Sequence, residues 1–335
     1  MRALPEHVRA LLAPGMDKRN ERENAALAKA LMAIHACGDP DGLLPAAVRR
    51  GVVFAFDPQR VRPPAVAATN GLAVLFARMP ARREEMGDFI LAMVHELAHG
   101  VQVENGFLPS IWAREAVPAD SVLVSVLMEA AATATAVDYG WKMYQKGDVR
   151  AMESLMDPAY AHVGAAWSYR SHVLQNGPWS VMDGSAKVAA VRGWFREEKM
   201  VAHYAGETCA RIRREIVGVM GELRQKRDIL ARMLAENPGF HLAAHFLPGE
   251  SLSAEGRLCR SLYETLAPQP GQPILLDALG GMKELEDFRG KLPSRMMEEC
   301  GRDYHHARMA LMAEEKRLRQ EHHPVGPVPR FGRKS

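Results

Sequence analysis

Residues 83–104, REEMGDFILAMVHELAHGVQVE, are the stretch on which the fold class depends. Acidic residues occupy its first turns, where the positive end of a helix dipole favours them. Apolar residues then recur at helical spacing, and Gly106 and Pro109 end the pattern. The stretch therefore predicts one long amphipathic helix, and the neighbouring elements can be assigned around it.

Two short runs of β-prone residues precede this helix. Gly51–Phe56 (GVVFAF) ends at Asp57 and Pro58, and Gly71–Ala77 (GLAVLFA) begins after Asn70. Both runs are rich in Val and Phe and are too short for helices, so we predict two strands. Because the link between them is short and contains prolines, we expect the two strands to be antiparallel neighbours.

Most of the remaining chain is predicted to be helical. Helices are expected at 22–36, from about Asp120 to Lys146, and, with a charged amphipathic pattern, at 207–236 and 294–321. Ala and Met are abundant and aromatic residues make up only 7% of the chain, which favours helix over strand. The predicted fold class is mainly α with a small antiparallel β-sheet (α+β), extended by helices at both ends.

The length of 335 residues suggests two domains, or one domain with extensions. We divide the chain into an N-terminal helical segment (1–48), a central domain (49–210), a C-terminal helical region (211–322) and a disordered tail (323–335). A Gly- and Pro-rich stretch at 266–273 (LAPQPGQP) indicates a linker or surface loops between the later helices.

The charge balance and the cysteines restrict the classes of function. Lys and Arg number 43 and Asp and Glu number 40, which gives a net charge of +3 and no argument for nucleic acid or a membrane as a partner. The four cysteines, Cys37, Cys209, Cys259 and Cys300, are far apart and form no CxxC pair. We therefore expect reduced thiols and a cytoplasmic location.

The long helix contains His95-Glu-Leu-Ala-His99, an HExxH motif. Residues four apart lie one turn apart on the same face, so His95 and His99 can bind one metal ion between their imidazoles. Glu96 is turned by about 100° from His95 and lies beside that site, where it can polarise a water and pass its proton to the leaving amine. A catalytic zinc needs a third protein ligand and an open fourth position.

Glu129 is the candidate for the third ligand. It lies within Ser121–Val137 (SVLVSVLMEAAATATAV), a nearly uncharged segment of about membrane-spanning length that we interpret as a buried helix of a soluble domain. A carboxylate inside an apolar helix is costly unless it is paired or binds a metal. The small residues Ala130–Ala132 and Ala134 would let this helix approach the HExxH helix closely, and Thr133, one turn after Glu129, could hydrogen-bond a ligand.

Other residues keep alternatives open. His241 and His245 (HLAAH) are also four apart, but this segment lacks the glutamate, and the Pro-Gly pair before it permits only a short helix. If Glu129 is not a ligand, His203, His241 or His245 would have to supply the third donor. Tyr204 or His203 could stabilise the oxyanion of a tetrahedral intermediate.

The segments VHELAHG and LMEAAATA, with the strand GLAVLFA before them, resemble the zincin metallopeptidases of the gluzincin type, which carry HExxH on one helix and Glu on the next. More narrowly, the chain is similar to an uncharacterised bacterial metallopeptidase family with a later Trp-Phe and Tyr segment. Trp194, Phe195 and Tyr204 (GWFREEKMVAHYAGE) match that segment. The resemblance covers roughly residues 50–210.

The resemblance implies a minimal zincin-like core that binds one Zn²⁺ per chain through His95, His99 and Glu129. It also implies Glu96 as general base and a peptide or protein as substrate, and Tyr204 remains a further catalytic candidate. We therefore expect a zinc-dependent metallopeptidase that hydrolyses peptide bonds with a metal-activated water. The alternative is a non-catalytic helical scaffold or interaction protein that keeps a zincin-like shape. The oligomeric state stays open.

Overall fold

The computed structural model describes residues 4–14, 19–61, 66–69, 72–82, 85–104, 117–158, 160–247 and 282–321. The chain divides into two compact units. Unit 1 contains Met1–Leu108, Leu123–Ala205 and Ser253–Leu292, and unit 2 contains Pro109–Val122, Gly206–Leu252 and Pro293–Ser335. The expected linker at 266–273, Cys259 and the expected tail at 323–335 lie outside the described residues. The division at residues 48, 210 and 322 stays a prediction.

Helices dominate both units, so the prediction of a mainly α protein with a small sheet is confirmed. Unit 1 holds α1 (Glu6–Leu12), α2 (Glu21–Ala36), α3 (Leu43–Arg50), α4 (Glu85–Glu104), most of α6 (Pro118–Gln145), α7 (Arg150–Met156), α8 (Val163–Asn176), α9 (Trp179–Met182), α10 (Ser185–Trp194) and α16 (Met282–Arg289). Unit 2 holds most of α11 (Glu198–Gln225), with α12 (Arg227–Glu236), α13 (Leu242–Phe246) and α17 (Ser294–Glu321).

The sheet of unit 1 has the strand order β1-β3-β2, with β1 at Val53–Phe56, β2 at Ala67–Thr69 and β3 at Ala73–Phe76. β2 pairs with β3 in the antiparallel sense, but β1 and β3 are parallel, with Val53 opposite Ala73. The expectation of an antiparallel β1–β3 pair is therefore wrong, and the sheet is mixed. The reason is β2, because this extra strand turns the chain round before β3 begins.

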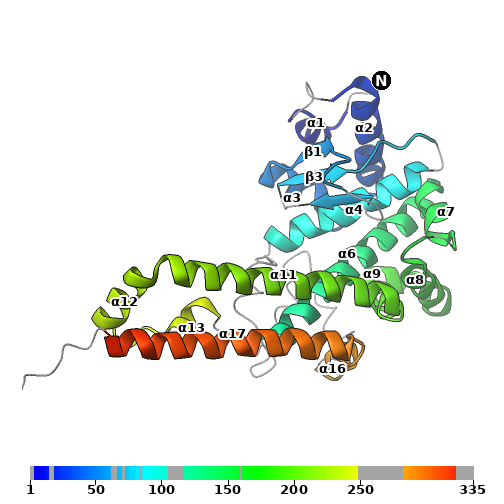
Figure 1. Ribbon diagram of the computed structural model, residues 1–335. Coiled ribbons are helices and arrows are strands. Elements are labelled where there is room, and N and C mark those ends of the chain that lie inside the picture. Colours follow the sequence, from blue (N-terminus) through cyan, green and yellow to red (C-terminus); the bar gives the residue numbers. More distant parts are fainter. Residues whose placement is uncertain are drawn as a thin grey trace, which may run out of the picture. The chain divides into compact units, whose positions relative to one another are not determined.

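The sheet lies against α4 (Figure 1), and aromatic rings form the contact between them. Phe89 of α4 lies with its ring centroid 4.5 Å from that of Phe76 and 6.1 Å from that of Phe56. Phe76 and Phe89 are almost fully buried, and each such ring contributes about 1.5–3 kcal/mol by leaving water. Gly87 lets α7 come close to α4, because a Cβ there would lie 2.2 Å from the Arg150 carbonyl oxygen. These contacts fix the first half of α4.

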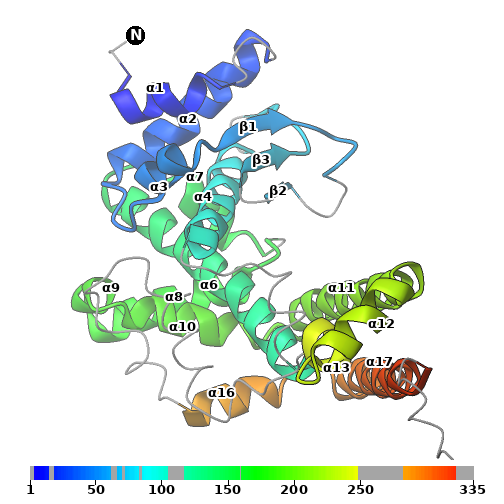
Figure 2. The same cartoon turned by 90° about the vertical axis from the view of Figure 1, so that its left-hand side faces the viewer.

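The helix α6 forms the core of unit 1. It is the helix among the described residues that is long and apolar enough to cross a membrane by length and composition, and 83% of that window is buried inside the protein. The apolar stretch Ser121–Val137 thus packs against protein, as the buried-helix interpretation requires. Figure 2 shows α6 running from below the sheet and α4 past α8 and α10.

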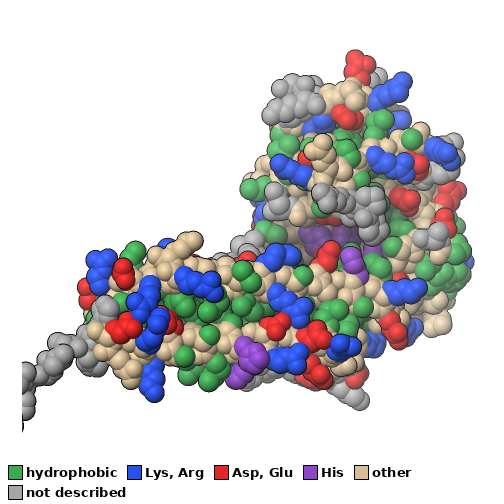
Figure 3. All heavy atoms as spheres, viewed as in Figure 1, with side chains coloured by type: hydrophobic (Ala, Val, Ile, Leu, Met, Phe, Trp, Pro, Cys, Tyr) green, Lys and Arg blue, Asp and Glu red, His purple; other side chains and the backbone are tan. Residues whose placement is uncertain are grey.

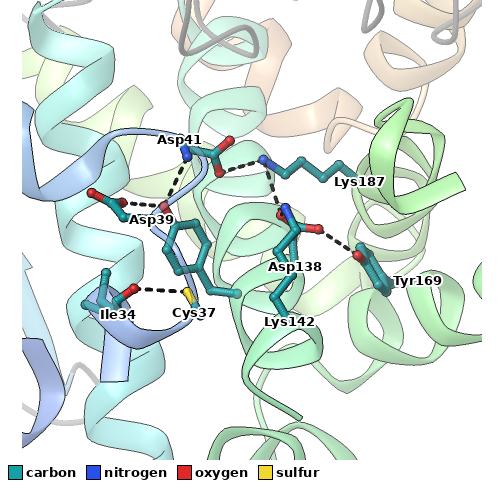
Figure 4. A network of polar contacts seen from close by, with 9 residues as sticks. Ile34, Cys37, Asp39, Asp41, Asp138, Lys142, Tyr169 and Lys187 are labelled. Carbon is teal, nitrogen blue, oxygen red and sulfur yellow. Dashed lines mark hydrogen bonds and ion pairs between the residues drawn. The ribbon is translucent and has the colours of Figure 1, made fainter. Parts of the chain in front are cut away.

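A buried polar network fixes how α6 is turned about its own axis (Figure 4). Lys187 of α10 lies between two carboxylates, with Nζ 2.6 Å from Asp41 Oδ2 and 3.6 Å from Asp138 Oδ2. The Tyr169 hydroxyl donates to Asp138 Oδ1 at 2.6 Å, and Lys142 Nζ lies 2.6 Å from Asp138 Oδ2. Burying a carboxylate or an ammonium group without an opposite charge would cost several kcal/mol, and these contacts give each buried charge a partner. The network therefore holds Asp138 toward α8 and α10.

This orientation decides where Glu129 points. Glu129 precedes Asp138 by nine residues, which is about two and a half helical turns, so the two side chains leave α6 on opposite sides. Because Asp138 is held toward α8 and α10, Glu129 faces away from them, and its contacts are with the histidines of α4.

Unit 2 is a set of amphipathic helices in which α17 runs beside α11 (Figure 1). Arg213 of α11 binds Asp303 of α17 with 2.8 Å between Nε and Oδ2. Glu315 of α17 accepts hydrogen bonds from the backbone N–H of Leu242 at 2.8 Å and binds His241 Nδ1 at 2.9 Å, which holds the short helix α13. The amphipathic helices expected at 207–236 and 294–321 are present, with the first interrupted between α11 and α12.

Candidate metal centre

Three side chains from two helices of unit 1 converge on one point. His95 and His99 extend from one face of α4, and Glu129 extends from α6. His95 Nε2 and His99 Nε2 are 3.0 Å apart. Glu129 Oε2 lies 3.3 Å from His95 Nε2 and 3.4 Å from His99 Nε2. The structure therefore brings together the three residues that the sequence analysis proposed as ligands.

The distances among these atoms match the edges of a metal coordination sphere. A tetrahedral zinc with bonds of about 2.0–2.1 Å has ligand atoms about 3.3–3.4 Å apart. The three observed separations of 3.0, 3.3 and 3.4 Å are close to that value. Two imidazoles and one carboxylate are also a donor set that suits zinc and leaves a fourth position open. The residues present thus fit a bound divalent ion.

Gln102 determines which nitrogen of His99 is free to bind a metal. Its Nε2 donates to the Met128 carbonyl oxygen of α6 at 3.0 Å, so its Oε1 is the atom that faces His99. Oε1 lies 2.7 Å from His99 Nδ1 and can only accept, so Nδ1 carries the proton. When the His99 ring is neutral, its lone pair is then on Nε2, the atom that faces His95 and Glu129. Gln102 was not foreseen, because its partner is a backbone carbonyl of another helix.

The charges at the cluster are strongly coupled. Burial alone would lower the pKa of His99, but the charge and hydrogen bond of Glu129 outweigh it and raise that pKa to about 9. Burial alone would raise the pKa of Glu129, but the charge of His99 and hydrogen bonds from both histidines hold it well below its ordinary value. Without a metal, the cluster therefore keeps an ionised carboxylate beside a protonated imidazole, and a divalent ion would displace that proton.

Glu96 lies on α4 beside the two histidines and is 8% exposed. Burial raises the pKa of its carboxyl group, Glu129 adds to this effect, and the charges of His95 and His99 oppose it. Within the described part of the chain, its carboxylate has no hydrogen-bond partner. A carboxylate that is dry, raised in pKa and not engaged by the protein can accept a proton from a water.

His162 is a further residue of the site that sequence reasoning missed. It lies just before α8, and its imidazole is parallel to that of His95, with 6.3 Å between the ring centroids and 7° between the planes. Burial, with the charge of His95 in the same direction, lowers its pKa to about 4. The segment around it follows no motif spacing, so only the tertiary structure connects it with the HExxH helix.

The sequence analysis also gave possible roles at the site to Tyr204 and Thr133. Tyr204 is on α11, where its ring centroid lies 5.8 Å from that of Trp194 and 5.1 Å from that of His203. Its part in oxyanion stabilisation stays a prediction. Thr133 was expected to hydrogen-bond a ligand, but its buried hydroxyl has no hydrogen-bond partner among the described residues, so that expectation is wrong.

The alternative ligands have other partners. His241 binds Glu315 in unit 2, and the ring of His245 packs against Phe240 and Phe246. Among acidic residues near the motif, Glu104 forms an ion pair with Arg49 at 2.9 Å, and Asp138 belongs to the buried network. Within the described residues, the cluster that could hold a metal ion is formed by His95, His99 and Glu129.

A comparison with known protein families matches the part of the chain that contains the three candidate ligands. Residues 72–216 match a protein family described as "Putative metallopeptidase family (DUF6782)". The matched region runs from β3 into α11 and includes both the HExxH motif and Glu129. No curated protein and no solved structure matches the chain. The family match supports a metallopeptidase, and with it a bound metal ion and a peptide or protein substrate.

Proposed function

We propose that this protein is a zinc-dependent metallopeptidase of the gluzincin type that hydrolyses peptide bonds in the cytoplasm, with one Zn²⁺ per chain. The observation that carries the proposal is the convergence of His95 Nε2, His99 Nε2 and Glu129 Oε2 within 3.0–3.4 Å of one another. The family match to residues 72–216 adds the substrate class. The buried free thiols of Cys37, Cys209 and Cys300 are compatible with a reducing compartment.

His95, His99 and Glu129 would hold the zinc. When bound, zinc acts as a Lewis acid and lowers the pKa of a coordinated water to about 7. Gln102 keeps the lone pair of His99 directed at the ligand cluster. The carboxylate of Glu129 would neutralise part of the positive charge of the metal. Because this carboxylate is buried, it needs a positive partner, and the metal would supply one.

Glu96 is the general base in this proposal. It accepts a proton from the attacking water and then delivers that proton to the nitrogen of the leaving amine. Its burial favours this role, because a carboxylate with a raised pKa is a better base than an ordinary glutamate. Its position next to His95 in the chain places it on α4 beside the ligands and not among them.

The test uses the full chain, its zinc content and a quenched fluorescent peptide library. Glu96→Gln should keep about one zinc per chain and lose hydrolysis by about 10²–10⁴-fold. Glu104→Gln is the matched control, since Glu104 lies on the same helix but is exposed and paired with Arg49, and it should retain activity. Loss of zinc from Glu96→Gln, or unchanged turnover, would show that the roles are wrongly assigned.

The alternative of a non-catalytic interaction protein draws support from unit 2. Figure 3 shows hydrophobic side chains exposed between charged ones along α11 and α17. Val217 is 71% exposed, Met309 is 50% exposed and Met312 is 53% exposed. Wild-type protein that binds no zinc and hydrolyses no peptide would favour this alternative over the enzyme.

A further inference from the structure

Two of the buried cysteines lie side by side in unit 2. Cys209 of α11 and Cys300 of α17 are 1% and 0% exposed, and both are free thiols. The thiol of Cys300 donates a hydrogen bond to the sulfur of Cys209, so the two side chains are in contact. The two residues are far apart in the sequence, and the packing of α17 on α11 brings them together.

Contacts on either side of the two thiols hold the helices in register. About one turn earlier, Met296 of α17 lies over Gly206 of α11, where an added Cβ would lie 3.5 Å from Met296 Cε. About one turn later, Arg213 Nε lies 2.8 Å from Asp303 Oδ2. Residue numbers on both helices increase together through these contacts, so α11 and α17 run in the same direction (Figure 1). The thiols therefore meet within a packed helix interface.

Their surroundings make the two thiols unequal. The hydrogen bond from Cys300 lowers the pKa of the Cys209 thiol, burial opposes this effect, and the charge of Arg213 lowers the pKa further. The same hydrogen bond, together with burial, raises the pKa of Cys300. Cys209 therefore ionises first, and the thiolate is the form that reacts with oxidants. By contrast, the Cys37 thiol donates to the Ile34 carbonyl oxygen, and burial raises its pKa to about 11.

A neighbouring pair of cysteines can serve a metal site or a disulfide. A structural zinc site usually has four protein ligands, and a catalytic one has three. Across the described ranges, the group of three or more donors that could hold a metal is His95, His99 and Glu129. No third donor thus joins the thiol pair within those ranges, and this favours a disulfide.

We propose that Cys209 and Cys300 form a modification site, at which hydrogen peroxide converts the two thiols to a reversible disulfide between α11 and α17. The inference stands independently of the proposed function. Because both residues are almost fully buried, a small oxidant such as peroxide reaches them more easily than a bulky one such as glutathione disulfide. The disulfide would stabilise unit 2 by closing a long loop of the unfolded chain.

The oxidation proceeds in two steps. The Cys209 thiolate attacks one oxygen of the peroxide, the O–O bond breaks, and a sulfenic acid and a hydroxide ion form. The Cys300 sulfur then attacks the Cys209 sulfur, and the S–O bond breaks as the S–S bond forms. The departing hydroxide takes the proton of Cys300 and becomes water. In total the two thiols lose two electrons and two protons, and one peroxide becomes two waters.

The experiment treats the reduced full chain with a small molar excess of hydrogen peroxide, blocks the remaining thiols and maps the peptides by mass spectrometry. We expect a peptide that links Cys209 to Cys300, and a fall in free thiols after denaturation from four to about two per chain. The urea midpoint of unfolding should rise by about 1 M or more, and dithiothreitol should reverse both changes.

Two variants test the assigned roles, with circular dichroism as the check on folding. Cys300→Ala should form no disulfide and should accumulate a sulfenic acid at Cys209 that dimedone labels. Cys37→Ala is the matched control, because Cys37 is equally buried but has a raised pKa, and it should form the disulfide as wild type does.

Three results would overturn the inference. The first is that peroxide leaves all four thiols of the folded chain free. The second is that the linked peptides contain Cys37 or Cys259 in place of Cys209 or Cys300. The third is that folded Cys300→Ala shows no dimedone label at Cys209, which would mean that Cys209 is not the thiol that peroxide attacks. Zinc content and peptide hydrolysis, which test the proposed function, enter none of these outcomes.

Discussion

Replacing Gln102 by Leu should weaken zinc binding although all three proposed ligands are unchanged. The substitution removes the 2.7 Å hydrogen bond to His99 Nδ1 and the 3.0 Å bond to the Met128 carbonyl oxygen. Leu has a similar volume and favours helix, so α4 itself should be unaffected. The neutral His99 ring then loses the acceptor that holds its proton on Nδ1, and a share of the neutral rings will carry the proton on Nε2.

The expected loss of zinc affinity can be estimated from other hydrogen-bond partners of metal-binding histidines. Removing the group that orients a metal-binding histidine typically costs about 10–100-fold in metal affinity, or about 1.4–2.7 kcal/mol. Gln102 is buried and both of its hydrogen bonds are of normal length, so the full range applies. Gln102→Glu should lose less than Gln102→Leu, because a carboxylate still accepts from Nδ1–H although it cannot donate to the Met128 carbonyl.

The assay is competition for zinc against a chromophoric chelator at constant pH. Gln145→Leu is the matched control, since Gln145 is exposed at the end of α6 and should leave the dissociation constant unchanged. Circular dichroism of each variant checks the fold. If Gln102→Leu binds zinc within about twofold of wild type, the hydrogen bond does not set the tautomer of His99, and the reasoning from its geometry is refuted.

Glu129→Ala should lose tight zinc binding but keep its helix, as measured by metal content and circular dichroism, whereas Glu104→Ala on the exposed end of α4 should keep its zinc. Retention of tight zinc by Glu129→Ala would reject the ligand set. Zinc binding at pH 7 should release about one proton, because the raised pKa of about 9 leaves His99 protonated below that pH and the metal displaces the proton; release should fall toward zero above pH 9. Calorimetry in two buffers of different ionisation enthalpy measures it, and heats independent of buffer at pH 7 would contradict it. Lys187→Met should lower the free energy of unfolding in urea by about 3–5 kcal/mol, because it removes the cation that lies 2.6 Å from the buried carboxylate of Asp41. A loss below about 1 kcal/mol would mean that water or other groups replace the lysine.

The sheet illustrates a limit of local reasoning. The two longer strands were recognisable from runs of Val and Phe, but β2 is only Ala67–Thr69, and Ala has low strand propensity. Without β2, a short link between two strands indicates a hairpin. The parallel pairing of β1 and β3 depends on hydrogen bonds to that third strand, which no periodicity in the sequence records.

Local sequence did determine the parts of the site that depend on helical periodicity and on the cost of burial. Two histidines four residues apart face the same side of any helix, and a carboxylate in an Ala-rich apolar helix needs a positive partner. These two rules selected His95, His99 and Glu129 without coordinates. They act within one helix each, so the spacing of residues along the chain carries the information.

The tertiary structure alone decided which groups surround those three residues. Gln102 matters because the Met128 carbonyl of α6 comes within 3.0 Å of it, and His162 matters because the segment before α8 packs beside α4. The turn of α6 about its axis is likewise set by the buried network around Asp138. Each depends on the approach of segments far apart in the sequence, and the composition and spacing of any one segment do not specify such an approach.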